Sequence, residues 1–236
     1  MSPSRTEFAK RIDHTLLKAT ATVTDVDRLC EEAKRFDFWS VCIAPCNVRR
    51  AREHLEGSGV KVCAVVGFPL GSDTASIKLA ETVKAVEDGA GEIDMVMNIG
   101  AFRSGDHDLV FNEINSVSQF CHTRSRLLKV IIECCYLTDE EKVKAARLAE
   151  LAGTDFVKTS TGMGTGGATV EDVKLLRKSL LSKTRIKAAG GIGTLEKALA
   201  MIAAGADRIG TSSGAKIMGE WPAAAGNKPV AEPKSG

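Results

Sequence analysis

Residues 154–191, TDFVKTSTGMGTGGATVEDVKLLRKSLLSKTRIKAAGG, contain one strand–helix–strand unit in a single run. The segments that begin near residues 154 and 185 are short and include β-branched residues, which is typical of strands. Between them, Thr169 followed by Asp172 three residues later is the pattern of a helix N-terminus. Two strands joined by a helix pair in parallel, so this stretch predicts a βαβ unit.

The same alternation of strand and helix patterns extends along the whole chain. Strand candidates begin near residues 12, 38, 60, 92, 127, 154, 185 and 206, with helical repeats of apolar residues between them. Eight such units in 236 residues predict an α/β protein with a closed (β/α)8 barrel, a TIM barrel, in a single domain. A doubly wound open sheet uses the same alternation and is the structural alternative. The weakest strand candidate is the first, IDHTLL (12–17).

Local signals predict where helices begin and end. Capping pairs predict three helix starts, at Thr24 with Asp27, Thr138 with Glu141 and Thr169 with Asp172. Glycines just before the next strand predict three helix ends, at Gly89, Gly153 and Gly205. We expect the barrel domain to span residues 1–218. Residues 219–236 are rich in Pro, Ala, Gly and Lys and predict a flexible tail.

The charges of the chain nearly cancel, with 32 Lys and Arg against 30 Asp and Glu and a net charge of +2. This balance argues against a nucleic-acid-binding protein, which carries a clear basic excess. No apolar run approaches the roughly 18 residues that a membrane span needs, and residues 1–11 lack the apolar segment of a signal peptide. We therefore expect a soluble cytoplasmic protein with neither nucleic-acid nor membrane partners.

Two lysines stand at the ends of consecutive strand candidates, where barrel enzymes carry their catalytic groups. Lys158 in TDFVKTS and Lys187 in RIKAAGG alternate with apolar neighbours that suit the helix-facing side, so both lysines are predicted to point into the barrel. Neighbouring strands lie about 4.8 Å apart, so each ammonium group is expected to disfavour protonation of the other. A single strand-end lysine is usually solvated, but two in succession favour a catalytic pair.

Two aspartates are candidate partners of these lysines. Asp94 in EIDMVMN has the alternation of an inward-facing residue within an apolar run, and a buried carboxylate needs a cation such as Lys158 or Lys187. A structural ion pair is the alternative reading of Asp94. Asp13 in IDHTLL is the weaker candidate, because an aspartate near a helix-to-strand junction is commonly a cap.

Glycine-rich segments follow the last three strand candidates. They contain Gly162, then Gly190 and Gly191, then Ser212 and Ser213. Many barrels bind phosphate between the loops after strands seven and eight, where glycine lets backbone N–H groups approach the anion and serine adds donors. The segments therefore predict a phosphate site, although glycine also serves simply to make turns.

The spacing of potential metal ligands favours neither a metal site nor a bound cofactor. The four histidines are scattered, the seven cysteines include no CxxC pair, and no Walker or dinucleotide-binding sequence is present. We therefore predict no metal and no cofactor. Lysine and aspartate are left to carry the chemistry, which indicates Schiff-base catalysis on a phosphorylated carbonyl compound.

These residues make the chain resemble the deoxyribose-phosphate aldolase family over roughly residues 6–218. The matching segments are IDHTLLKA (12–19), VCIAPCNV (41–48), VVGFPLG (65–71), EIDMVMNIGA (92–101), KVIIE (129–133), FVKTSTG (156–162), KAAGGIGT (187–194) and RIGTSSG (208–214). The resemblance implies a class I aldolase on a (β/α)8 barrel. Such an enzyme cleaves 2-deoxy-D-ribose 5-phosphate to D-glyceraldehyde 3-phosphate and acetaldehyde, in the breakdown of deoxyribonucleosides.

The resemblance also implies roles for individual residues. Lys158 would form the Schiff base, Lys187 would be its neighbouring lysine, and Asp94 would be the acid–base carboxylate. The residues that would bind substrate are Gly162, Gly190, Gly191, Ser212, Ser213, Asp13, Thr15 and Thr161. The partners implied are a phosphorylated sugar, acetaldehyde and further copies of the chain in a dimer or tetramer.

The chain departs from the family pattern at two positions near the implied phosphate site. Met163 stands where some members have a lysine, and Gly193 stands where an arginine is common. Charge compensation of the phosphate is therefore expected to be weaker or to come from elsewhere. Two other functions stay open at this point: a Schiff-base aldolase with a different aldehyde donor, and a barrel that binds sugar phosphates without catalysis.

Overall fold

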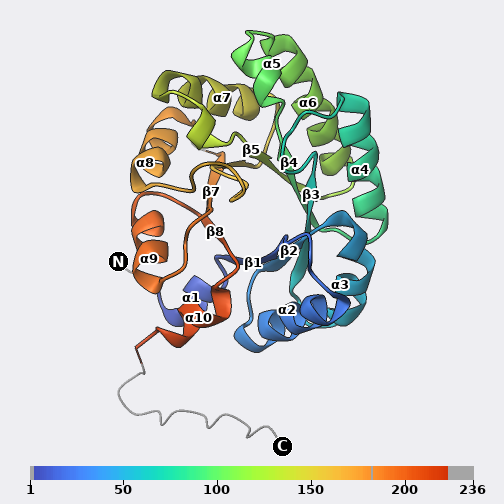
Figure 1. Cartoon of the computed structure of the whole chain (residues 1–236), viewed down its shortest axis with the longest axis vertical. Coiled ribbons are helices and arrows are strands. Elements are labelled where there is room, and N and C mark those ends of the chain that lie inside the picture. The colour runs from blue at the N-terminus through green and yellow to red at the C-terminus, as the bar shows by residue number, and fades with distance from the viewer. Residues whose placement is uncertain (1–2, 182, 223–236) are drawn as a thin grey trace, which may run out of the picture.

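The computed structural model describes residues 3–181 and 183–222. Eight parallel strands form a closed barrel in which each strand pairs with the next and β8 pairs with β1 (Figure 1). The strands are β1 (Ile12–Leu16), β2 (Ser40–Ile43), β3 (Lys61–Val66), β4 (Glu92–Val96), β5 (Leu127–Ile131), β6 (Phe156–Lys158), β7 (Arg185–Ala189) and β8 (Arg208–Thr211). The prediction of a single-domain (β/α)8 barrel is confirmed, the open sheet is excluded, and the weak first strand candidate is a strand.

Helices surround the barrel and cover the outer face of its strands (Figure 1). They are α1 (Arg5–Ala9), α2 (Val23–Phe36), α3 (Val48–His54), α4 (Ala75–Glu87), α5 (Ile99–Arg103), α6 (His107–Thr123), α7 (Asp139–Leu151), α8 (Val170–Ser179), α9 (Leu195–Ala203) and α10 (Gly214–Gly219). Short 3-10 turns, η1 (Pro45–Asn47) and η2 (Cys134–Tyr136), follow β2 and β5. The apolar core lies between strands and helices, as the complete burial of Val26 on α2 and Ile114 on α6 illustrates.

Most of the predicted helix boundaries are confirmed. Thr138 and Glu141 form a reciprocal capping box, and the Thr169 hydroxyl accepts a hydrogen bond from the Asp172 amide. The glycines expected at three helix ends all adopt positive φ just beyond α4, α7 and α9, at Gly89, Gly153 and Gly205.

The predicted cap of Thr24 with Asp27 is wrong. The cap of α2 is Thr22 with Asp25, two residues earlier, and Asp27 lies inside the helix, where Arg50 donates to it at 2.7 Å. Both pairs have the same three-residue spacing, so the local pattern alone does not separate the two frames.

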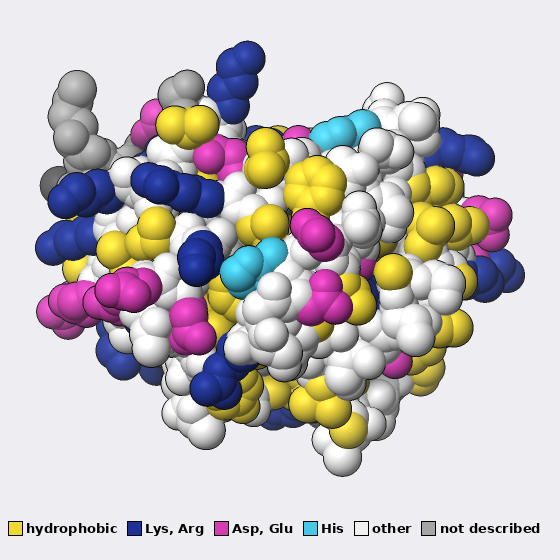
Figure 2. All heavy atoms as spheres, turned by 90° about the horizontal axis from the view of Figure 1, so that it is seen from above, with side chains coloured by type: hydrophobic (Ala, Val, Ile, Leu, Met, Phe, Trp, Pro, Cys, Tyr) yellow, Lys and Arg dark blue, Asp and Glu magenta, His cyan; other side chains and the backbone are white. Residues whose placement is uncertain are grey.

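The inward face of the barrel differs from the outer core in being rich in charge. Alternation along β2 sends Val41 and Ile43 to the main apolar core, whereas Cys42 belongs to a small inner cluster with Cys63 and Val65. The remaining inward positions include carboxylates, lysines and an arginine, described below. Charged and apolar side chains are interspersed on the outer face that Figure 2 shows.

The C-terminal end of the described chain packs against its beginning. Gly219 is the last residue of α10, and the Trp221 ring lies 5.2 Å from the Phe8 ring on α1. Residues 223–236 of the expected tail lie outside the described residues. Within the described ranges, no helix combines the length and the apolar character that crossing a membrane requires.

Candidate active site

Seven buried charged side chains lie inside the barrel and come from six of its strands. They are Asp13 on β1, Glu92 and Asp94 on β4, Lys129 on β5, Lys158 on β6, Lys187 on β7 and Arg208 on β8. Strand register brings two pairs together, because Asp94 is opposite Lys129 and Lys158 is opposite Lys187. The predicted inward orientation of both candidate lysines is therefore confirmed.

Asp94 is the hub of this group and is completely buried. Its Oδ2 atom accepts hydrogen bonds from Lys158 Nζ at 2.8 Å and from Lys187 Nζ at 2.7 Å, and its Oδ1 atom accepts one from Lys129 Nζ at 2.8 Å. Burial alone would raise the pKa of Asp94, but the three ammonium groups more than offset it and hold the pKa well below its ordinary value. Asp94 is therefore ionised at neutral pH.

Asp13 lies in the same group and is not a cap. Its Oδ2 atom forms an ion pair with Lys187 Nζ at 2.5 Å, and its Oδ1 atom accepts from Ser40 Oγ and from Arg208, both at 2.7 Å. Burial opposes ionisation of Asp13, yet Arg208 and Lys187 lower its pKa overall. The weak candidate from the sequence is thus a direct neighbour of Lys187.

The expected mutual suppression of protonation does not hold for Lys187. Burial disfavours its ammonium form, but the carboxylates of Asp13 and Asp94 outweigh this effect and raise the pKa of Lys187. Lys187 is therefore a fixed positive charge at neutral pH. It shares the Oδ2 atom of Asp94 with Lys158, so its charge lies next to the Lys158 amine.

A deeper layer of the barrel contains three charged residues that sequence reasoning missed. Lys129 Nζ pairs with Glu92 at 2.5 Å, and Glu92 also accepts from Arg208 at 3.2 Å and from the Trp39 indole at 2.6 Å. Glu92 and Arg208 begin their strands, away from the C-terminal ends searched for catalytic groups. Glu92 alternates with Asp94, and this shared parity is the signal that could have found it.

The charges of the group balance when one lysine is neutral. Four cationic side chains face three carboxylates, so full protonation leaves one positive charge in excess. Lys129 lies within 4.0 Å of three carboxylates and Lys187 of two, whereas Lys158 contacts Asp94 alone among the described residues. Loss of a proton therefore costs least at Lys158.

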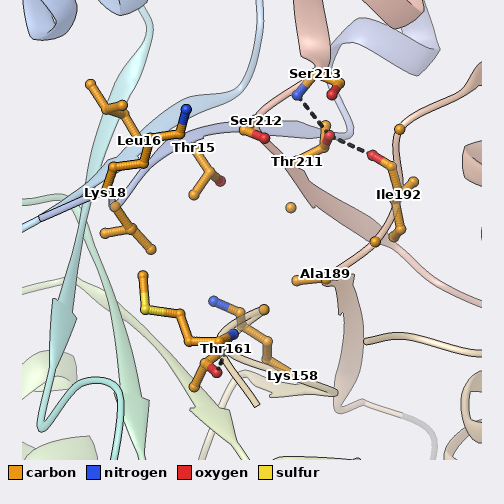
Figure 3. A pocket seen from close by; sticks show the side chains of 17 residues that line it. Thr15, Leu16, Lys18, Lys158, Thr161, Ala189, Ile192, Thr211, Ser212 and Ser213 are labelled. Carbon is orange, nitrogen blue, oxygen red and sulfur yellow. Dashed lines mark hydrogen bonds between the residues drawn. The ribbon is translucent and has the colours of Figure 1, made fainter. Parts of the chain in front are cut away.

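A cavity of about 390 Å³ opens above Lys158 at the C-terminal end of the strands (Figure 3). All the predicted loop residues line it, together with Lys158: Thr15, Thr161, Gly162, Gly190, Gly191, Ser212 and Ser213. The completely buried Asp13, Asp94 and Lys187 lie outside its lining. Among the charged groups inside the barrel, Lys158 is thus the one that the cavity reaches.

The loops around this cavity are held in close contact with one another. A Cβ atom on Gly167 would lie 2.3 Å from the Gly190 carbonyl oxygen, so only glycine fits where these two loops meet. Thr211 Oγ1 donates to the Ile192 carbonyl at 2.6 Å and accepts from the Ser213 amide at 2.9 Å, which links the loops after β7 and β8 (Figure 3). The Thr161 hydroxyl donates to Glu133.

Cys42 and Cys63 face Asp94 from neighbouring strands. The Cys63 thiol donates to Asp94 Oδ1 at 3.1 Å, and the Cys42 sulfur lies 3.8 Å from Oδ2. Their three ligand atoms lie within 4.8 Å of one another, a spacing that a metal ion would accept. Both carboxylate oxygens already accept from lysine ammonium groups, so this position is electrostatically unsuited to a further cation.

Comparison with known proteins finds the same family along nearly the whole chain. The DeoC/LacD family aldolase model matches residues 8–219. A deoxyribose-phosphate aldolase of Thermococcus gammatolerans is 55% identical over 214 residues, 90% of this chain and 95% of that protein. One of Streptococcus equi subsp. zooepidemicus is 56% identical over 209 residues, 89% of this chain and 94% of that protein.

Solved structures with the same fold include two of this type. A crystal structure described as a putative deoxyribose-phosphate aldolase from Coccidioides immitis has a TM-score of 0.89 at 41% identity, over 93% of this chain and 87% of that one. The deoxyribose phosphate aldolase of Aeropyrum pernix, described as a unique tetrameric structure, has a TM-score of 0.85 at 33% identity, over 92% of each chain.

Proposed function

This chain belongs to the DeoC/LacD family of aldolases, and on that premise we propose that it reversibly cleaves 2-deoxy-D-ribose 5-phosphate through a Schiff base on Lys158. The products are D-glyceraldehyde 3-phosphate and acetaldehyde, and the role is the breakdown of deoxyribonucleosides. The observation that carries the proposal is Lys158 itself, which contacts one carboxylate and lies at the floor of a cavity rimmed by glycine and serine loops.

The reaction begins with the neutral amine of Lys158 attacking the C1 aldehyde of the open-chain sugar. Loss of water from the carbinolamine gives a protonated imine, which accepts the electron pair of the C2–C3 bond as that bond breaks. The 3-hydroxyl loses its proton in this step and leaves as the aldehyde of glyceraldehyde 3-phosphate. Protonation of the remaining enamine at C2 and addition of water release acetaldehyde and the free lysine.

Asp94 and Lys187 supply the proton transfers in this proposal. A single oxygen of Asp94 is shared by the two lysine nitrogens, at 2.8 Å from Lys158 and 2.7 Å from Lys187. That oxygen is therefore within reach of any proton exchanged at Lys158. Lys187 is a protonated donor at neutral pH because its pKa is raised against the burial penalty by Asp13 and Asp94.

The loops at the mouth of the cavity hold the other end of the substrate. Gly190, Gly191, Ser212 and Ser213 line the cavity on one side, and Thr15 lines it next to β1. Backbone N–H groups and hydroxyls are suited to phosphate oxygens. Holding the 5-phosphate there positions C1 against Lys158, and such fixing of reactants lowers the barrier.

The chain is further proposed to work as a homo-oligomer, a dimer or a tetramer. The support is the A. pernix relative, whose structure is described as tetrameric. The described surface also exposes large apolar side chains, including Leu70 and Leu151. Sedimentation of the purified chain would give the number of copies, and a monomer at micromolar concentration would contradict this part of the proposal.

The test is cleavage of 2-deoxy-D-ribose 5-phosphate compared with a panel of other phosphorylated sugars, with both aldehyde products measured. We expect the deoxyribose phosphate to be cleaved fastest and the Lys158→Met variant to be inactive. Faster cleavage of another sugar phosphate would indicate an aldolase with a different donor. Saturable binding without turnover would indicate a non-catalytic sugar-phosphate-binding barrel.

A further inference from the structure

The cavity above Lys158 is nearly free of charged side chains. Of the 17 residues that line it, all within the described ranges, the charged ones are Lys158 and Lys18. Lys158 points to the interior, where its ammonium group contacts Asp94. Lys18 follows β1 by two residues and lies at the rim. The rim therefore has one cationic side chain.

Lys18 has no internal partner among residues 3–181 and 183–222. It is exposed, and no hydrogen bond or ion pair links it to any residue in those ranges. Figure 3 shows its side chain extended over the rim from the β1 side of the cavity. Burial of a structural role is thus not what holds Lys18 at this position, and its ammonium group is available to a ligand.

The opposite side of the cavity offers donors but no cation. Gly190, Gly191, Ser212 and Ser213 are neutral, and the half-exposed Met163 adds an apolar side chain. A phosphate monoester carries a charge of about −1.5 to −2 at pH 7. Neutral donors satisfy its oxygens, but its charge is compensated best by a nearby ammonium group.

We propose that Lys18 is a specificity-determining residue that binds the 5-phosphate of the substrate from the β1 side of the cavity. This inference rests on the proposed function and adds the residue by which the chain selects a phosphorylated aldehyde over its neutral counterpart. Lys18 takes no part in the bond-making steps, because Lys158, Asp94 and Lys187 lie below it in the barrel. Its contribution is to substrate binding.

The first test compares Lys18→Gln with the unchanged chain on two substrates that differ only in the phosphate. For 2-deoxy-D-ribose 5-phosphate we expect KM to rise about tenfold with little change in kcat, as for loss of one charged contact. For unphosphorylated 2-deoxy-D-ribose we expect kcat/KM to stay unchanged. Lys18→Arg should keep most of the affinity, because it keeps the charge.

A matched control is Lys61→Gln, which removes an exposed lysine at the start of β3, at the other end of the barrel. We expect this variant to behave like the unchanged chain on both substrates. A loss in Lys18→Gln that is equal for both substrates would overturn the inference, because a residue that recognises phosphate acts on one substrate alone.

The second test does not depend on the reaction. Inorganic phosphate is titrated calorimetrically into the unchanged chain, Lys18→Gln and Lys61→Gln. We expect Kd to be raised about tenfold in Lys18→Gln alone. Equal phosphate affinity in all three proteins, or no binding by the unchanged chain, would overturn the inference. Failure of the proposed function would instead leave phosphate binding dependent on Lys18 while 2-deoxy-D-ribose 5-phosphate is not cleaved.

Discussion

Asp94 accepts hydrogen bonds from three lysines, and the contacts that each lysine makes with other carboxylates separate their roles. Lys129 and Lys187 have further carboxylate neighbours, and Lys158 has none among the described residues. Burial opposes the charge of Lys129, but Asp94, Cys63 and Glu92 raise its pKa well above the ordinary value. Two lysines are thus fixed cations, and the third is free to exchange its proton and react.

Removing the deepest lysine should destabilise the whole chain. Lys129→Met leaves Glu92 without its closest cation and Asp94 with one fewer, and breaking a buried ion pair from one side costs about 3–5 kcal/mol of unfolding free energy. Urea denaturation of the variant and the unchanged chain measures this loss. The double variant Lys129→Met/Glu92→Gln removes one charge of each sign and should recover part of it. Equal stability of the single variant and the unchanged chain would contradict this role.

At the same scale, the sequence predicts the inward lysines but not their full surroundings. The orientation of Lys158 and Lys187 follows from alternation along one strand, which is a local property. The contact of Lys129 with Asp94 depends on the register between β4 and β5, and no single segment contains that information. The raised pKa of Lys187 was missed for the same reason, because Asp13 reaches it from β1.

Among the secondary-structure elements, the loops after β6 and β7 depend on each other. The Ala168 amide donates to the carbonyls of Ala189 and Gly190, both at 3.1 Å, and Gly167 packs directly on Gly190. These contacts bring Gly162 and Gly190 to one side of the cavity. The mouth of the proposed site is thus built by contacts between loops as well as by the barrel.

A methyl group at Gly167 should disturb this mouth. Its Cβ would lie 2.3 Å from the Gly190 carbonyl oxygen, a backbone atom that moves only with its loop. We expect Gly167→Ala to raise KM for the phosphorylated sugar several-fold and to cost about 1–3 kcal/mol of unfolding free energy. Steady-state kinetics and urea denaturation provide the two measurements.

The control for this change is Gly91→Ala, where an added Cβ meets nothing closer than 3.8 Å. Its kinetics should match those of the unchanged chain. If Gly167→Ala also kept its KM and its stability, the two loops would not be coupled as described.

Element boundaries are predicted well where a signal is unique and poorly where it is duplicated. Gly153 and the Thr138 box stand alone in their segments, and both mark helix boundaries. Near α2, two Thr-x-x-Asp frames overlap, and the helix begins with the earlier one, at Thr22. The short α1 and the 3-10 turns η1 and η2 lack a long periodic pattern, so periodicity does not reveal them.

For the molecule as a whole, the buried charges determine how stability depends on pH. Burial opposes the ionisation of Glu92 and Asp94, but Lys129 and the other cations lower the pKa of both in the folded state. A depressed pKa contributes stability that is complete above the unfolded value of about 4 and is lost as pH falls toward the folded value. The raised pKa values of Lys129 and Lys187 contribute stability below about pH 10 that declines only above it.

We therefore expect stability to vary little between pH 6 and pH 9 and to fall steeply below about pH 4. Urea midpoints measured from pH 3 to pH 9 test this dependence. Glu92→Gln should be less stable at pH 7 but lose less on acidification, since one group of depressed pKa is gone. Glu53→Gln, at an exposed position, should keep the original slope. An unchanged midpoint from pH 7 to pH 3 would rule out the buried network as the source of acid sensitivity.

The most direct test of the account asks which lysine forms the covalent bond. The chain is incubated with acetaldehyde and sodium borohydride at pH 7, digested, and searched by mass spectrometry for N-ethyl-lysine. We predict modification at Lys158, prevented by excess 2-deoxy-D-ribose 5-phosphate and absent at that position in Lys158→Met. A substrate-protected N-ethyl group on Lys187 or Lys129, with Lys158 unmodified, would contradict the central claim.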